Sequence, residues 1–146
     1  MKSESVRLDC GGLVARVCPR AYSLGVMRIR TLRPCPSSPN CVSTEAQDEG
    51  HAIAPIRYRK SLAEAKEGLK EIIDSLPRTR LVEEDESYLR YEFTSLLLRF
   101  VDDVEFVLDD EAKTIHFRSA SRVGYGDLGV NRARMEQVRA LVGEKL

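Results

Sequence analysis

The sequence predicts an α+β domain in which two helices pack on one face of a twisted antiparallel β-sheet of about four to five strands. Apolar residues recur at helical spacing over residues 61–76 and again over about 132–143. Between these segments, over residues 81–118, apolar and polar residues alternate as they do in half-buried strands. The order of one helix, four strands and a second helix is typical of an α+β fold.

The length of 146 residues indicates one domain, which we place at residues 30–146. Residues 1–29 show no sustained period and are predicted to form a poorly ordered N-terminal extension. The 23 basic and 23 acidic residues give zero net charge, so no nucleic-acid partner is expected. The sequence has no transmembrane segment and no recognisable secretory signal, which predicts a cytoplasmic protein.

The first helix is predicted over residues 61–76. Ser61 and Glu64 have the spacing of a capping box, in which each side chain bonds the backbone N–H of the other residue. Pro77 ends the helix, because proline cannot continue the hydrogen-bond ladder. The apolar stripe consists of Leu62, Ala65, Leu69, Ile72, Ile73 and Leu76.

Four strands are predicted after this helix. The first begins at residues 81–83 and is followed by a polar turn. In residues 88–95, Leu89, Tyr91 and Phe93 share one face, opposite three polar side chains. The last two strands alternate in the same way on either side of a turn at about residues 109–112. One face of the sheet should therefore pack on the helices, while the other is charged.

Matching the apolar faces predicts a register for the last two strands. The expected opposite pairs are Phe106 with Ile115, Val104 with Phe117, Glu105 with His116, and Asp103 with Arg118. A slip of one residue would destroy both the apolar pairs and the opposite-charge pairs.

The remaining segments carry weaker signals. The last helix is predicted to begin after Asn131, which would act as its N-cap. Residues 33–50 are predicted to form a loop, since they show no period. Residues 51–56 predict a short edge strand, because Pro55 cannot donate to a ladder.

The segment Gly124-Tyr125-Gly126-Asp127-Leu128-Gly129 matches the G-x-G-x-x-G pattern of dinucleotide-binding loops. That pattern requires a βαβ unit, and here only one helix follows, so we interpret the glycines as tight-turn residues with positive φ. A glycine-rich turn entering a helix still offers backbone N–H groups to an anion. Four arginines surround it in the sequence: Arg118, Arg122, Arg132 and Arg134.

Two interpretations of these arginines stay open. In one, they bind an anion together with the glycine-rich turn. In the other, they pair with the acidic run of Asp102, Asp103 and Glu105, and thereby hold the sheet to the last helix.

The leading functional hypothesis is a small binding module for an anionic small molecule or a group on a protein partner. Tyr125 and Asp127 would contribute specificity. The ligand-binding residues would be Arg118, Ser119, Ser121, Arg122, Gly124, Tyr125, Gly126, Asp127, Asn131 and Arg132. Asp102, Asp103 and Glu105 would support the site, and Cys35, Asn40 and Cys41 would form a structural loop. The charged strand face and the two loops should converge at one end of the sheet.

Two other function classes are weighed beside it. An enzyme would use Asp102 or Asp103 with Arg118 and Ser121 around the same cleft. A structural or assembly factor would instead use this surface as a protein interface.

An exposed apolar run would favour the assembly factor. The run Leu96, Leu97, Leu98 and Phe100 is the candidate, although we expect half of it to face the core.

No cofactor and no metal are predicted. Cys35, Cys41, His51 and His116 could ligate a metal, but their spacing fits no zinc motif and the chain has no C-x-x-C pair. Four cysteines are too few for a disulfide scaffold, and only Cys35 and Cys41 lie close enough in sequence to suggest a bridge.

Three segments resemble the bacterial and plant family called domain of unknown function 1499. They are the C-P-x-S-P-N-C-V-S run at Cys35–Ser43, the F-V-D-D-V-E-F run at Phe100–Phe106, and the R-S-A-S-R-x-G-x-x-D-x-G-x-N-R run at Arg118–Arg132. The resemblance covers about residues 30–146 and implies no particular activity. Many members look exported or membrane-attached, and export would make a Cys35–Cys41 disulfide credible.

Overall fold

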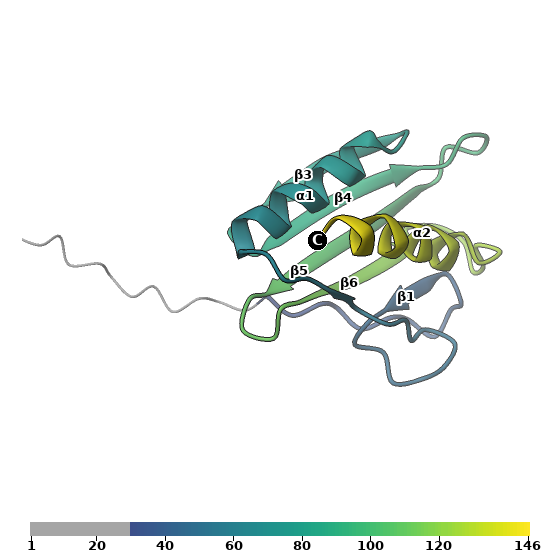
Figure 1. The fold of residues 1–146 in the computed structure, drawn as a ribbon. Helices are drawn as coiled ribbons and strands as arrows, with labels where there is room; N and C mark the ends of the chain where they lie inside the picture. The colour runs from purple at the N-terminus through teal and green to yellow at the C-terminus, as the bar shows by residue number, and fades with distance from the viewer. Residues whose placement is uncertain (1–29) are drawn as a thin grey trace, which may run out of the picture.

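The computed structural model describes residues 30–146, which form an open antiparallel sheet with two helices on one face (Figure 1). The α+β prediction is confirmed, with six strands in the sheet. The elements are β1 (Cys41–Ser43), β2 (Ile56–Arg57), α1 (Leu62–Ser75), β3 (Thr79–Glu84), β4 (Tyr88–Thr94), β5 (Val101–Asp109), β6 (Thr114–Ser121) and α2 (Val130–Lys145). The prediction made for residues 1–29 lies outside the described residues.

The strand order is β1-β6-β5-β4-β3, and β2 also pairs with β6. The four strands β3 to β6 form a meander, as the alternating pattern predicts. β1 lies in the region expected to be a loop, so that expectation is wrong for Cys41–Ser43. Of the predicted edge strand at 51–56, only Ile56 lies in a strand, while Ala52 forms an isolated bridge with Ser43.

Helix α1 has the predicted capping box. The Ser61 hydroxyl accepts the N–H of Glu64, and the Glu64 carboxylate accepts the N–H of Ser61 at 3.1 Å. Ala65, Leu69, Ile72 and Ile73 are buried, as the stripe predicts. The helix ends where Leu76 turns to extended backbone before Pro77.

The core lies between the helices and the apolar face of the sheet. Alternate residues of β4, β5 and β6 are buried there against both helices. The largest fully buried side chains include Tyr91, Phe106, Phe117, Leu69, Ile73, Met135 and Val138. We call the opposite face of the sheet the far face.

The predicted register of β5 and β6 is wrong by two residues. The observed opposite pairs are Phe106 with Phe117, Leu108 with Ile115, Glu105 with Arg118, Val107 with His116, and Asp103 with Ala120. The connection is longer than expected because Asp109 accepts the N–H groups of Glu111 and Ala112, and Lys113 adopts a positive φ of 51°. A two-residue shift keeps every side chain on its face, so the alternation could not exclude it.

Helix α2 begins at Val130, so Asn131 is not its N-cap. Gly129 is the N-cap, in the left-handed region with φ of 79°. The capping bonds come from Asp127, whose carboxylate accepts the N–H of Gly129 at 3.0 Å and of Asn131 at 2.9 Å. Asn131 therefore lies inside the first turn, where its side chain is completely buried.

The β4–β5 loop also differs from expectation. All four apolar residues of the run, Leu96, Leu97, Leu98 and Phe100, are exposed, so none covers the core. The chain here leaves the strand and turns back, with Ser95 N–H bonded to Phe100 O at 2.8 Å and Arg99 at a φ of 52°. Period-two alternation ends where the strand ends.

Candidate functional site

Asn40 connects the two unusual segments of the sequence. Its Nδ2 donates to the carbonyl of Gly124 at 2.6 Å, and its own carbonyl accepts the N–H of Ser121 at 3.1 Å. Because β1 pairs with β6, the cysteine loop and the glycine-rich loop lie in direct contact.

Asn131 lies at the centre of a buried polar network that joins these loops to α2. Its Nδ2 donates to Ser121 Oγ at 2.9 Å and Asp127 Oδ2 at 2.7 Å, and lies 3.2 Å from the carbonyl of Asn40. Its Oδ1 accepts from Ser119 Oγ at 2.5 Å and Arg134 Nη1 at 3.1 Å. Four of the candidate binding residues are thus bonded to one another.

Three of the four arginines are held by neighbouring groups. Arg122 donates two hydrogen bonds to the Asp103 carboxylate, from Nε at 2.7 Å and from Nη2 at 2.8 Å. Its Nη2 also donates to Glu92 at 2.5 Å. This pairing lowers the pKa of Asp103 and raises that of Arg122. Arg134 binds Asp102 at 2.6 Å, so pairing with the acidic run, one of the two interpretations, is observed here.

Arg132 pairs with no carboxylate of the residues that the structure describes. Its guanidinium donates to the backbone carbonyls of Ala52 at 2.9 Å and Gly50 at 3.0 Å, and it fixes the loop that follows β1. The arginine therefore ties α2 to a loop far away in the sequence.

Arg118 differs from the other three. It lies on the far face, opposite Glu105 and not opposite Asp103 as predicted. Its side chain is 11% exposed, yet its one ion-pair contact is 3.4 Å long, from Nη1 to Glu105 Oε2. The Nε atom is buried and has no hydrogen-bond partner among residues 30–146. Burial lowers the pKa of Arg118, the Glu105 carboxylate opposes that shift, and the nearby Arg33 reinforces it.

A pocket of about 520 Å³ lies on the far face and is lined in part by Glu105, the ion-pair partner of Arg118. Its lining residues are Arg30, Thr31, Arg33, Glu83, Tyr88, Arg90 and Glu105. Residues 30–33 form one wall because Leu32 packs with Tyr88 and Val107, and Arg30 stacks 4.4 Å from the centre of the Tyr88 ring. We call this cavity the far-face pocket.

Glu105 connects Arg118 with the far-face pocket. Its Oε1 accepts the hydroxyl of Tyr88 at 3.0 Å, and its Oε2 lies 3.9 Å from Arg33. Burial, helped by the Glu105 charge, raises the pKa of Tyr88 to about 12, so the phenol stays a donor. One carboxylate is shared by two arginines at long distances.

Arg33, Arg90 and Tyr88 were not among the predicted site residues. Arg90 and Tyr88 could have been found, because both alternate onto the same charged face as Arg118. Arg33 lies in a segment whose apolar residues show neither helical nor strand periodicity, and no local sequence signal identifies it.

The residues of the enzyme hypothesis are divided between the two faces of the sheet. Asp102 and Ser121 form an opposite pair on the helix side, while Asp103 and Arg118 lie on the far face. Asp102 is buried against Arg134, and Asp103 is held by Arg122. The structure does not bring these four groups into one cleft.

The glycine-rich loop has the predicted tight turns. Gly124 and Gly129 adopt positive φ angles of 92° and 79°, and Leu128 adopts 54°. Gly126 has open space around it, and Tyr125 is 77% exposed. Tyr125 therefore points away from the Asn131 network, while Asp127 is part of it.

The cysteine and histidine candidates lie in separate contacts. A disulfide joins Cys35 and Cys41, whose Cα atoms are 5.7 Å apart. His51 bonds Asp48 at 2.6 Å and His116 contacts Thr44 at 3.3 Å. Within residues 30–146, no group of three His, Cys, Asp or Glu side chains is arranged to hold a metal ion.

The fold and the contacts define a class of protein: an α+β domain with an open sheet, whose longest sequence motifs fold together as one buried polar network. The chain belongs to the family described as protein of unknown function (DUF1499), whose model matches residues 31–142. It matches neither a curated protein nor a solved structure. Over the described residues, neither helix has the length and apolarity needed to span a membrane.

Proposed function

We propose that the protein is a small binding module that recognises an anionic group, on a small molecule or a partner, at the far-face pocket beside Arg118. The observation that carries the proposal is the guanidinium of Arg118, which is buried with one long ion-pair contact and, within the described part of the chain, no acceptor for its Nε. Among the predicted binding arginines, Arg122 and Arg132 already have short bonds, so the proposal keeps Arg118 as the anchor.

The physical reason is the cost of an unsatisfied buried donor. Leaving a buried polar group without a partner costs about 1–3 kcal/mol, and more for a charged group. A carboxylate or phosphate oxygen that takes the place of Glu105 would form a short charge-assisted bond with this guanidinium. Binding would therefore recover free energy that the unliganded fold loses.

The local charge supports the same ligand class. The guanidinium groups of Arg30, Arg33 and Arg90 line the pocket, against the two carboxylates of Glu83 and Glu105. Arg118 adjoins the pocket through Glu105, while Asp85 and Asp103 adjoin it as partners of Arg30 and Arg90. Arg33 is 69% exposed, so it can turn toward an incoming anion. Glu105 competes with the ligand, since it occupies the position between Arg118 and Arg33.

The test uses inorganic phosphate and citrate as probes in isothermal titration at low ionic strength. We expect saturable binding to the unmodified protein. Arg33→Gln should weaken it, because it removes a pocket charge without touching the core. Glu105→Gln should strengthen it about tenfold, since removal of one competing charge is worth roughly 1.4 kcal/mol at such short range.

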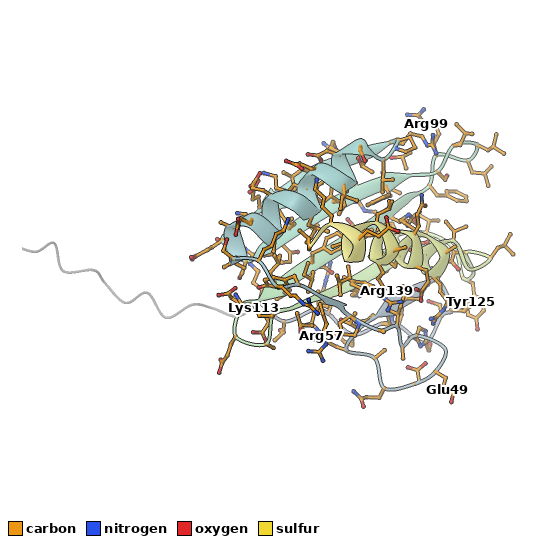
Figure 2. All side chains as sticks on the ribbon, viewed as in Figure 1. Glu49, Arg57, Arg99, Lys113, Tyr125 and Arg139 are labelled. Atoms are coloured by element: carbon orange, nitrogen blue, oxygen red, sulfur yellow. A yellow bond between two sulfur atoms is a disulfide. The ribbon has the colours of Figure 1, made fainter. Side chains whose placement is uncertain are left out.

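Arg57→Gln is the matched control, because Arg57 is an exposed arginine on β2 (Figure 2). It should bind both probes like the unmodified protein. If Glu105→Gln leaves phosphate and citrate affinity unchanged, or if the Arg57 variant weakens it as much as the Arg33 variant, the proposal is wrong.

A further inference from the structure

Exposed apolar side chains gather at one end of the molecule. Ten large apolar residues are exposed within residues 30–146, and eight of them lie on two loops or directly beside them. They are Leu96, Leu97, Leu98 and Phe100 on the β4–β5 loop, Val123, Tyr125 and Leu128 on the β6–α2 loop, and Val130 at the first position of α2. We call these eight residues the apolar end.

The two loops are neighbours in space. The N–H of Arg122, at the start of one loop, bonds the carbonyl of Val101, next to the other, at 3.1 Å. Leu96 and Val130 also line one shared groove of about 460 Å³. Figure 2 shows Arg99 and Tyr125, one from each loop, at the same end of the molecule.

The apolar end carries positive charge that no carboxylate of residues 30–146 neutralises. Residues 95–100 and 122–130 contain one carboxylate, Asp127, and its oxygens accept three N–H groups from Gly129 and Asn131. Arg99 is exposed on the β4–β5 loop, and Arg78 lines the shared groove. Within the described part of the chain, neither arginine forms an ion pair.

We propose that the apolar end inserts into the interfacial region of a lipid bilayer that contains anionic lipids. Leucines on two protruding loops suit a fluid surface that deforms around them, whereas a rigid protein would need a matching cavity. Phe100 and Tyr125 fit the preference of aromatic rings for the interface, and Arg78 and Arg99 complement anionic headgroups. This surface lies apart from the far-face pocket, so the proposal stands independently of the function proposed above.

The test uses the full chain and two kinds of vesicle, phosphatidylcholine alone and phosphatidylcholine with about one third phosphatidylglycerol. We expect flotation with the mixed vesicles and weaker flotation with the neutral ones. Leu97→Ser should lower partitioning about tenfold, because Leu97 is 87% exposed and inserts without supporting the core. Leu141→Ser, an exposed leucine on α2, should leave partitioning unchanged.

A second readout follows insertion directly. The chain contains no tryptophan, so Leu97→Trp places a single reporter at the apolar end and Leu141→Trp places one elsewhere. The proposal is supported if vesicles shift the tryptophan fluorescence emission to shorter wavelength in Leu97→Trp and leave it unchanged in Leu141→Trp. Arg99→Gln should reduce the difference between mixed and neutral vesicles.

Two outcomes would overturn the proposal. One is the absence of flotation with either vesicle. The other is a concentration-dependent dimer in analytical ultracentrifugation that Leu97→Ser abolishes while vesicle binding is unaffected, which would assign the apolar end to a second copy of the chain.

Discussion

Asn131 is a single side chain that connects three segments of the chain. Its amide reaches the loop before β1, the end of β6 and the loop before α2, and its own N–H is bonded by Asp127. An asparagine amide has two N–H donors and a carbonyl with two acceptor sites, and here both parts are in use. A fully satisfied buried network of this kind fixes one arrangement of the loops.

Asn131→Ala should therefore be strongly destabilising. Loss of the amide leaves Ser119 and Arg134 short of a partner, so we expect a loss of about 3 kcal/mol in the free energy of unfolding. Urea denaturation followed by circular dichroism measures it. Gln47→Ala, which removes an exposed amide, is the control and should change stability by less than about 0.5 kcal/mol. A small effect of Asn131→Ala would mean that the network is not a structural lock.

His51 is a second residue whose surroundings set a testable property. The Nε2 atom faces the carbonyl of Ser38 at 3.0 Å, and the Nδ1 atom faces the carboxylate of Asp48 at 2.6 Å. Both oxygens are acceptors, so the protonated ring donates to both, and these two contacts raise the pKa of His51. The protonated ring is therefore stabilised in the folded protein. The loop after β1 is fixed in part through this contact.

The pH dependence follows from that direction. Because the folded pKa of His51 is above the unfolded value of about 6.5, its stabilisation is complete below about pH 6.5 and is lost as the pH rises through the folded pKa. We expect the melting temperature to fall over that interval, and the fall to be smaller in His51→Gln. Thermal unfolding at a series of pH values measures it, and His116→Gln should keep the fall. Parallel profiles for the unmodified protein and His51→Gln would contradict the assignment.

At the scale of elements, two glycines belong to helix α2 and its N-cap, and their replacement has opposite expected effects. Gly129, the N-cap, has a φ of 79°, whereas Gly143 lies inside the helix. An added Cβ meets nothing within 4 Å at either position, so only the backbone conformation differs.

Gly129→Ala should destabilise the protein by about 1–2 kcal/mol, because the Cβ of alanine makes the left-handed backbone conformation unfavourable. Gly143→Ala should stabilise it by about 0.5–1 kcal/mol, since alanine is the better helix former. Urea denaturation of both variants measures the two effects. If both variants stabilised the protein, the start of α2 would have to rearrange to relieve the strain at position 129, which contradicts the expectation.

The elements with local signals could be predicted from the sequence, and those fixed by distant contacts could not. Helix α1 carries its own capping box and stripe, and Leu89, Tyr91 and Phe93 mark β4 by alternation. Strand β1 has three residues and exists because it pairs with β6, some 75 residues later. The β5–β6 register depended on the length of one turn, and a two-residue ambiguity is invisible to a period of two.

The candidate site divides in the same way. The glycine turns and the pairing of Arg122 and Arg134 with the acidic run were within reach of the sequence. The far-face pocket was not, because Arg33 approaches Glu105 only through tertiary folding. The exposure of Leu97 and its neighbours was missed because a strand pattern was extended into a loop.

For the whole molecule, the Cys35–Cys41 disulfide closes the loop that contains Asn40. The double variant Cys35→Ser, Cys41→Ser should lose about 2 kcal/mol of stability, as expected for a short closed loop. Urea denaturation without reductant measures this loss. Added reductant should lower the stability of the unmodified protein to a similar extent and leave the variant unchanged; sensitivity of the variant to reductant would contradict this account.

Strand β3 is the edge of the sheet, next to β4 alone. Its pairing is interrupted by a bulge between Leu81 and Glu83, and Arg30 bonds Glu83 from outside. Irregular, charged edges resist the addition of a strand from another molecule. Consequently the exposed backbone of β3 is a poor template for amyloid-like growth, and we expect concentrated samples to resist fibril formation even though the sheet is not closed.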